Sequence, residues 1–163
     1  MTRNRTITDV MVFAAILRLI ADHGEKAVAF SAVARATGLA APSLVQRYGS
    51  LPDMLHTAFA AEWTRLQAQA DHAILQAAKT DKGPQALLKS VECPTAALLA
   101  ASLRDPDLNH HAAGWRGMVE AALSTLIDPA NAAMLFATWQ GQAIWSATPD
   151  KSFKLKDAVK RLS

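Results

Sequence analysis

The side chains with the clearest chemistry lie together in the short run APSLVQR, which begins at Ala41. Gln46 carries a donor and an acceptor on one amide, so it can pair with adenine through two hydrogen bonds. Ser43 offers a hydroxyl, and Arg47 offers a cation suited to a phosphate. Ala41 and Pro42 offer apolar surface for thymine methyl groups. These residue types suit contact with double-stranded DNA, and the alternative is that Ser43 and Gln46 are ordinary solvent-facing helix residues.

The same run lies inside residues 30–55, whose spacing predicts a helix-turn-helix. Ala34 is small enough to let two short helices cross closely, and Gly38 can adopt the left-handed conformation that ends the first helix. Leu44 then fills the angle between the pair. Ser31 is the expected N-cap of the first helix, and the proline of the run suits the first turn of the second helix.

An amphipathic helix is expected ahead of this motif, capped by Thr8 and ended by Gly24. Arg3 and Arg5 precede an apolar stretch, as in a secretory signal, but Asp9 interrupts that pattern and no cleavage site of small residues follows. The two arginines are then free to reach a phosphate backbone. The predicted apolar face of the helix consists of Val10, Phe13, Leu17 and Ile20.

Beyond the motif, prolines divide the chain into helices, and no long stretch alternates with the period of a strand. A long helix is predicted from Pro52 to about Gly83, then a proline-broken helical segment to Leu103, a turn over residues 104–109 and a helix over residues 110–127. The sequence therefore predicts an all-α fold. The apolar stripe of the long helix consists of Leu55, Phe59, Trp63, Leu66, Ala70, Ile74 and Ala77.

The segment that follows Asp128 is predicted to form a helix that is apolar on nearly all sides. Such a helix must be buried on more than one side. It is either part of a subunit interface, where Gly141 would permit close approach of a second backbone, or a central core helix, and both alternatives stay open here. The candidate interface residues are Leu135, Phe136, Trp139, Ala143 and Trp145.

Charge is distributed unevenly along the chain. Residues 1–50 contain six Lys or Arg against three Asp or Glu, residues 51–150 contain six against ten, and residues 151–163 contain five against one. The motif therefore lies on a basic segment, as expected of a phosphate-binding surface, although a solvated basic face would have the same composition. No apolar run approaches the roughly 18 residues of a membrane span, and one cysteine cannot form an internal disulfide. A cytoplasmic protein without membrane association is expected.

The order of an amphipathic helix, a helix-turn-helix and a long fourth helix is similar to that of the tetracycline-repressor (TetR) family of bacterial transcription regulators. The most specific part is GLAAPSLVQRYGSLPDML, and DPANAAMLFATWQGQAIW resembles the family's late dimerisation helix. The resemblance covers the whole chain and is strongest in the first 60 residues. The residues that match the family's run in place are Gly38, Leu39, Ser43, Leu44, Arg47, Tyr48 and Gly49.

The resemblance implies a three-helix DNA-binding domain over residues 1–51 and a helical ligand-binding and dimerisation domain over residues 52–163. It implies a homodimer whose recognition helices enter successive major grooves of a palindromic operator. A small hydrophobic effector would move these helices apart and release the DNA, as in a repressor. Tyr48 is expected to be chiefly a core residue with its hydroxyl at the surface. The candidate DNA contacts are Arg3, Arg5, Ala41, Pro42, Ser43, Gln46, Arg47 and Tyr48.

Three positions depart from the family's pattern. Val45 stands where the family has tyrosine, Leu51 where it has lysine, and Ala40 where it has serine or threonine. The tyrosine and the lysine are phosphate contacts in the family, and such contacts supply much of the affinity for DNA. Lys26 and Arg35 are further cations that can compensate. The alternative function is therefore a TetR-fold interaction or ligand-binding module that has lost operator binding.

The effector site is the least determined part of the chain. Aromatic and sulfur-containing side chains suggest a flat hydrophobic ligand, although such stripes are more often plain core. Cys93 is expected to be a buried structural cysteine, and the adjacent His110 and His111 would point about 100° apart on a helix, which prevents joint metal binding. No hydrolase, phosphate-loop or paired-cysteine motif occurs, so neither enzyme activity nor a cofactor is expected. The candidate ligand contacts are Trp63, Leu66, Cys93, Leu99, Trp115 and Met118.

Overall fold

The computed structural model describes residues 7–80, 83–146, 148 and 154–162, and every regular element over those residues is helical. The all-α class predicted from the sequence is confirmed. Within the part of the chain that the structure describes, no helix has the length and apolar character needed to cross a membrane.

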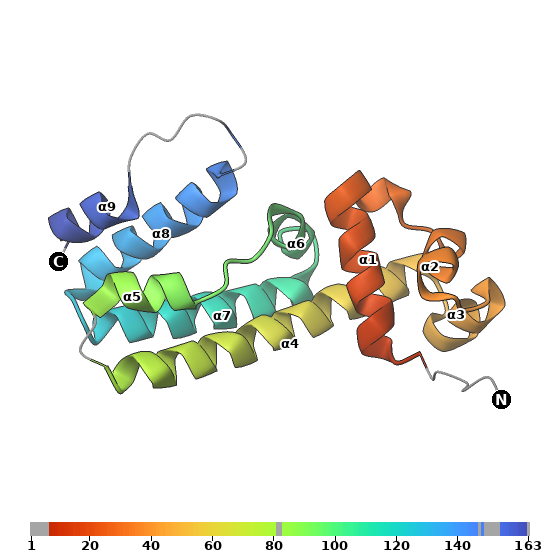
Figure 1. Ribbon diagram of the computed structural model, residues 1–163, viewed down its shortest axis with the longest axis horizontal. Helices are drawn as coiled ribbons and strands as arrows, with labels where there is room; N and C mark the ends of the chain where they lie inside the picture. Colours follow the sequence, from red (N-terminus) through yellow and green to blue (C-terminus); the bar gives the residue numbers. More distant parts are fainter. Residues whose placement is uncertain (1–6, 81–82, 147, 149–153, 163) are drawn as a thin grey trace. The chain divides into compact units, whose positions relative to one another are not determined.

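The N-terminal unit, Met1–Glu62, is built around a helix-turn-helix. Its elements are α1 (Asp9–His23), the 3-10 helix η1 (Glu25–Ala27), α2 (Phe30–Thr37), α3 (Ala41–Tyr48) and the first turns of α4 (Leu51–Ala78). Figure 1 shows α2 and α3 beside each other, and α2 also packs against α1. The helix-turn-helix predicted from the spacing of small and aliphatic residues is therefore present.

The apolar face of α1 differs from the predicted one. Val12, Ile16 and Ile20 are buried, whereas Val10 is 75% exposed. Apolar residues fill eight consecutive positions from Val10 to Leu17, so the sequence allows more than one phase of the stripe. Thr8 occupies the predicted N-cap position, but its side chain makes no capping hydrogen bond.

The turn between α2 and α3 has the predicted geometry. Gly38 ends α2 in the left-handed conformation, with φ at +79°, and donates its N–H to the carbonyl oxygen of Ala34 at 2.8 Å. Pro42 lies in the first turn of α3. The N-cap predicted at Ser31 is wrong, because α2 begins at Phe30 and Ala29 occupies the cap position, two residues earlier, without a side-chain hydrogen bond.

Each helix of the motif buries one side chain completely, Val33 in α2 and Leu44 in α3. Successive residues of a helix are rotated by about 100°, so the burial of Leu44 determines which side of α3 faces water. Pro42 and Gln46, two positions before and after Leu44, consequently lie on the outward side and are exposed.

The C-terminal unit, Trp63–Ser163, contains the rest of α4 and five further helices. These are α5 (Gly83–Ser90), α6 (Ala96–Ser102), α7 (Pro106–Ser124), α8 (Pro129–Trp145) and α9 (Leu155–Leu162). Helix α7 packs against α6 and α8, and α9 packs against α8 and α5 (Figure 1).

The bounds of α7 correct one prediction. A turn was expected over residues 104–109 and a helix over residues 110–127, but the helix begins at Pro106 and ends at Ser124. Its early start follows from the side chain of Asp105, which accepts hydrogen bonds from the backbone N–H groups of the second and third residues after it at 2.9 and 3.1 Å. Helix α8, by contrast, begins where predicted, with Asp128 as its capping residue.

Replacement of Leu44 by alanine should destabilise the protein by about 2–5 kcal/mol, because it removes a fully buried side chain. Val45→Ala is the matched control, since Val45 is 44% exposed, and it should change the free energy of unfolding by about 0.5 kcal/mol or less. Urea unfolding followed by circular dichroism measures both values. Equal destabilisation by the two changes would contradict the observed rotation of α3.

Candidate nucleic-acid interface

The outward face of α3 carries the residues predicted to contact bases. Pro42, Ser43 and Gln46 are exposed, and Ala41 is half-buried. Val45, which is 44% exposed, belongs to the same face. The face thus presents one amide, one hydroxyl and apolar surface, all without formal charge.

The C-terminal end of α3 is tied to the start of α1 by three residues that we call the Asp9 cluster: Asp9, Arg47 and Tyr48. Nη1 of Arg47 donates a hydrogen bond to Oδ1 of Asp9 at 3.2 Å and another to the carbonyl oxygen of Ile7 at 3.4 Å. The hydroxyl of Tyr48 donates to the same Oδ1 at 2.5 Å. Arg47 was predicted as a phosphate contact, and in this structure its guanidinium is already paired with a carboxylate.

Tyr48 has both of its predicted features, a ring that packs inside the unit and a hydroxyl near the surface. The ring centroid lies 6.0 Å from that of Phe13 on α1. Burial of the ring raises the pKa of Tyr48, and the hydrogen bond to Asp9 raises it further, because both favour the neutral hydroxyl. The hydroxyl of Tyr48 therefore donates its hydrogen bond within the protein, to Asp9.

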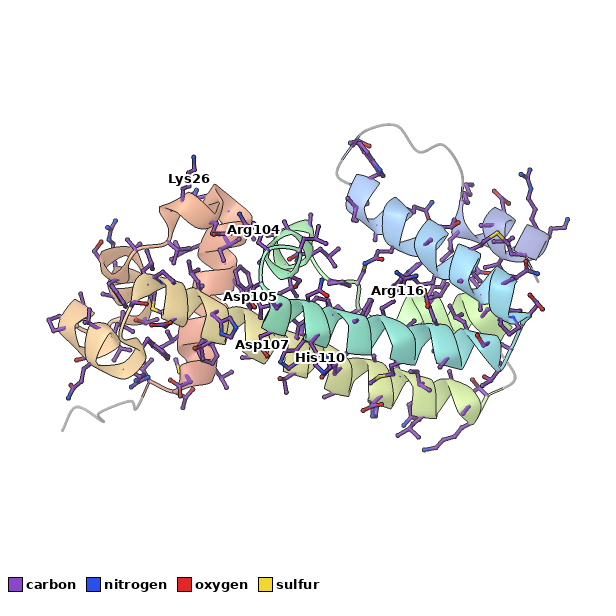
Figure 2. The ribbon with its side chains drawn as sticks, turned by 180° about the vertical axis from the view of Figure 1, so that it is seen from behind. Lys26, Arg104, Asp105, Asp107, His110 and Arg116 are labelled. Atoms are coloured by element: carbon purple, nitrogen blue, oxygen red, sulfur yellow. The ribbon has the colours of Figure 1, made fainter. Side chains whose placement is uncertain are left out.

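Among the described residues of the N-terminal unit, Lys26 and Arg35 are exposed cations that lie outside this cluster. Lys26 projects outward from η1 (Figure 2), and Arg35 lies on α2. Arg18 forms an ion pair with Asp22 on the same helix at 3.6 Å. The predicted contacts Arg3 and Arg5 lie outside the described residues.

The C-terminal unit has a core of four aromatic side chains, which we call the aromatic cluster: Trp63, Trp115, Phe136 and Trp139. The ring of Trp115 is central, with its centroid 6.0 Å from Trp63, 5.8 Å from Phe136 and 6.2 Å from Trp139. Nε1 of Trp63 donates to the hydroxyl of the buried Ser102 at 2.9 Å. Nε1 of Trp115 is also buried but has no hydrogen-bond partner among the described residues. A buried N–H donor without a hydrogen-bond acceptor lowers the stability of the folded protein, unless a bound molecule supplies the acceptor.

Only some of the residues predicted to contact a ligand lie together in the structure. Trp63 and Trp115 are adjacent in the aromatic cluster, and Leu66 is also fully buried. Leu99, Cys93 and Met118 are half-buried. Burial raises the pKa of the Cys93 thiol to about 11, so the thiol is protonated at neutral pH, as expected of a structural cysteine.

The predicted interface residues of α8 fall into two groups. Leu135, Phe136 and Trp139 are buried within the single chain, whereas Trp145 is 69% exposed and Ala143 is half-buried. The first three already belong to the core of their own unit. Only the C-terminal end of the predicted set still has surface to offer a partner.

Among the described residues, no group of three or more His, Cys, Asp and Glu side chains is arranged to hold a metal ion. His110 and His111 lie on successive positions of α7, and Figure 2 shows His110 near its start. Two features of the described residues remain as candidate binding groups: the outward face of α3 and the unpartnered Nε1 donor of Trp115.

No protein-family model matches the chain, and none of the curated proteins matches it. Its structure is similar to that of the multidrug binding protein EbrR complexed with malachite green, with a TM-score of 0.67 and 22% identity over 98% of this chain and 96% of that one. The complex of EbrR with imidazole gives 0.69 and 20% identity over 96% and 93%. The TetR-family member SCO1917 from Streptomyces coelicolor A3 gives 0.58 and 20% identity over 94% of each chain.

The chain has the TetR fold. The predicted resemblance is therefore confirmed at the level of the fold, from α1 to the last helices. The Asp9 cluster was missed by sequence reasoning, because Asp9 and Arg47 are 38 positions apart and neither has a local signal of the pairing. The cluster holds the C-terminal end of α3 to the start of α1.

Tyr48 is the single tyrosine of the chain, so the ultraviolet absorbance of tyrosinate reports its ionisation directly. We expect a midpoint above the ordinary 10.0 in the folded protein, and a lower midpoint in Asp9→Asn, which loses the carboxylate that holds the hydroxyl. Because the folded pKa exceeds the unfolded one, stability should fall as pH rises above the unfolded value.

The control for this titration is Asp22→Asn, which removes an acid from the same helix without touching the cluster. An unchanged midpoint in Asp9→Asn, or a wild-type midpoint at the value measured in denaturant, would show that the hydroxyl of Tyr48 does not depend on Asp9.

Proposed function

We propose that the chain is a DNA-binding transcription regulator of the TetR type, with α3 as the helix that enters the major groove. The observation that carries the proposal is the exposed, uncharged outward face of a helix whose opposite side is locked by the burial of Leu44. The hydroxyl of Ser43 and the amide of Gln46 suit base edges, and a helix of this size fits the groove. The TetR fold of the whole chain supports this reading.

Phosphate contacts would come from other cations of the N-terminal unit. Lys26 and Arg35 are exposed cations of the same unit, and Arg3 and Arg5 are candidates at the N-terminus. Arg47 remains a candidate as well, since a guanidinium has five N–H donors and its contacts with Asp9 and Ile7 run through Nη1. This set can replace the phosphate contacts that Val45 and Leu51 do not make.

We propose a homodimer, which a palindromic operator would require. Support comes from large apolar side chains that remain exposed on α8, with Met134 50%, Ile144 44% and Trp145 69% exposed. Met134 and Trp145 are 11 positions apart, which brings them to within about 20° of each other around the helix. A second copy of the chain would cover this stripe.

We propose that an aromatic effector binds beside Trp115 and releases the DNA, so that the protein acts as a repressor. EbrR has been solved with malachite green and with proflavin, both aromatic dyes. In this chain, the four rings of the aromatic cluster are buried against one another, and the unpartnered Nε1 of Trp115 at its centre offers one hydrogen-bond donor to an acceptor atom of the effector. The chemistry favours a flat hydrophobic compound with a single hydrogen-bond acceptor.

The combined change Ser43→Ala and Gln46→Ala should weaken binding to the protein's own upstream DNA by about tenfold or more, because it removes the base-reading hydrogen bonds of α3. Fluorescence anisotropy with competitor DNA, at two salt concentrations, measures the loss. Gln76→Ala is the control, since Gln76 is an exposed glutamine at the far end of α4.

The alternative function, a TetR-fold interaction module without an operator, predicts a different result. Binding would then be weak for every duplex, would vanish at higher salt, and would be the same for the double variant and the control. That outcome would also give meaning to the apolar residues Val45 and Leu51, which face solvent in part.

For the effector, quinoline and naphthalene form a matched pair of probes that differ by one ring nitrogen. Calorimetry should give tighter binding of quinoline by about fivefold, the value of one hydrogen bond to Trp115. Trp115→Phe should abolish this preference, and Trp145→Phe, at an exposed position, should keep it. Equal affinities of wild-type protein for both probes would refute a donor role for Trp115.

A further inference from the structure

The outward face of α3 has no cation of its own that could contact DNA. Pro42, Ser43, Val45 and Gln46 form this face, and none of them is charged. Arg47 is the single cation of the helix, and its Nη1 is engaged with Asp9 and with the carbonyl oxygen of Ile7. The face must therefore contact DNA through neutral hydrogen bonds and apolar surface.

Those two kinds of contact match one base pair better than the other. Guanine presents two acceptors in the major groove and is read by Arg or Lys, whereas adenine presents one donor and one acceptor and is read by Asn or Gln. Thymine adds a methyl group that only apolar surface recognises. Gln46 and Val45 together therefore have the chemistry that recognises an A·T pair.

The apolar half of the face is continuous. Val45 lies three positions after Pro42 and four after Ala41, the spacings at which helix side chains are neighbours. Gln46 follows at the next position and points about 100° away, toward the middle of the exposed side. A methyl group that meets Val45 would thus lie next to the base that meets Gln46.

We propose that Val45 is a specificity-determining residue that reads a thymine methyl group, so that the half-site contains a thymine beside the adenine read by Gln46. This inference rests on the proposed DNA-binding function. It gives a role to Val45, whose side chain has neither a charge nor a hydrogen-bonding group.

The test begins with duplexes selected by the full-length protein from a random-sequence pool. In the best-bound duplex, each thymine is replaced in turn by deoxyuridine, which removes the methyl group and keeps every hydrogen bond. At one position per half-site, wild-type protein should lose about fourfold in affinity, the value of one buried methyl group. Val45→Ala should bind the thymine duplex more weakly and should show no further loss with deoxyuridine at that position.

Leu75→Ala is the matched control, because Leu75 is an exposed apolar residue of the C-terminal unit, 61% exposed. This variant should keep the full sensitivity to deoxyuridine. The urea unfolding of Val45→Ala, measured as described for Leu44→Ala, shows independently whether the variant is folded.

Each outcome has a distinct meaning. Enrichment of no duplex would overturn the proposed DNA-binding function and this inference with it. Tight binding to selected duplexes without sensitivity to deoxyuridine, or equal sensitivity in wild type and Val45→Ala, would overturn the role of Val45 alone and leave the regulator intact. Loss of sensitivity in Val45→Ala but not in Leu75→Ala would establish the contact.

Discussion

The burial of Leu44 is the constraint on which the functional side of this protein depends. Helix α3 has eight residues, and a helix that short has little stability of its own in water. It persists because Leu44 is removed from water against the rest of the unit, and that same burial fixes its rotation. Gly38, at the end of α2, also determines the position of α3, since its left-handed conformation sets the direction of the chain between the two helices. The uncharged face that we assign to base reading is the consequence of these two residues.

The Asp9 cluster adds a second constraint at the end of the same helix. It joins Arg47 and Tyr48 to the first turn of α1, so α3 is held at its C-terminal end by the ion pair and hydrogen bonds and at its middle by apolar packing. The ion pair reduces the positive charge that α3 itself presents. Under the proposed function, affinity for the DNA backbone would depend on the exposed cations Lys26 and Arg35, and selectivity would depend on the neutral face.

The sequence predicted those parts of the molecule whose signals are local. The turn at Gly38 and the start of α8 at Asp128 follow from residues within a few positions of the feature. The side of α1 that is buried could not be predicted, because eight consecutive apolar residues from Val10 to Leu17 fit several faces. The pairing of Asp9 with α3 joins residues 38 and 39 positions apart, which spacing arguments do not reach. For α8, an apolar helix looks the same whether its own chain or a partner covers it, so its core and exposed residues separate only in the folded structure.

The face of α3 opposite Leu44 is the surface that we propose meets the bases of the operator. The most direct test of this claim is a nuclear magnetic resonance titration of the isotope-labelled protein with a selected duplex, read at the backbone amides of the N-terminal unit and of α9. We predict that the signals of Ser43, Val45 and Gln46 shift most and keep their shifts as salt is raised. Shifts confined to the basic helix α9 or to the surroundings of Lys26 and Arg35, and lost with salt, would contradict the claim, because they would report electrostatic attraction without base reading.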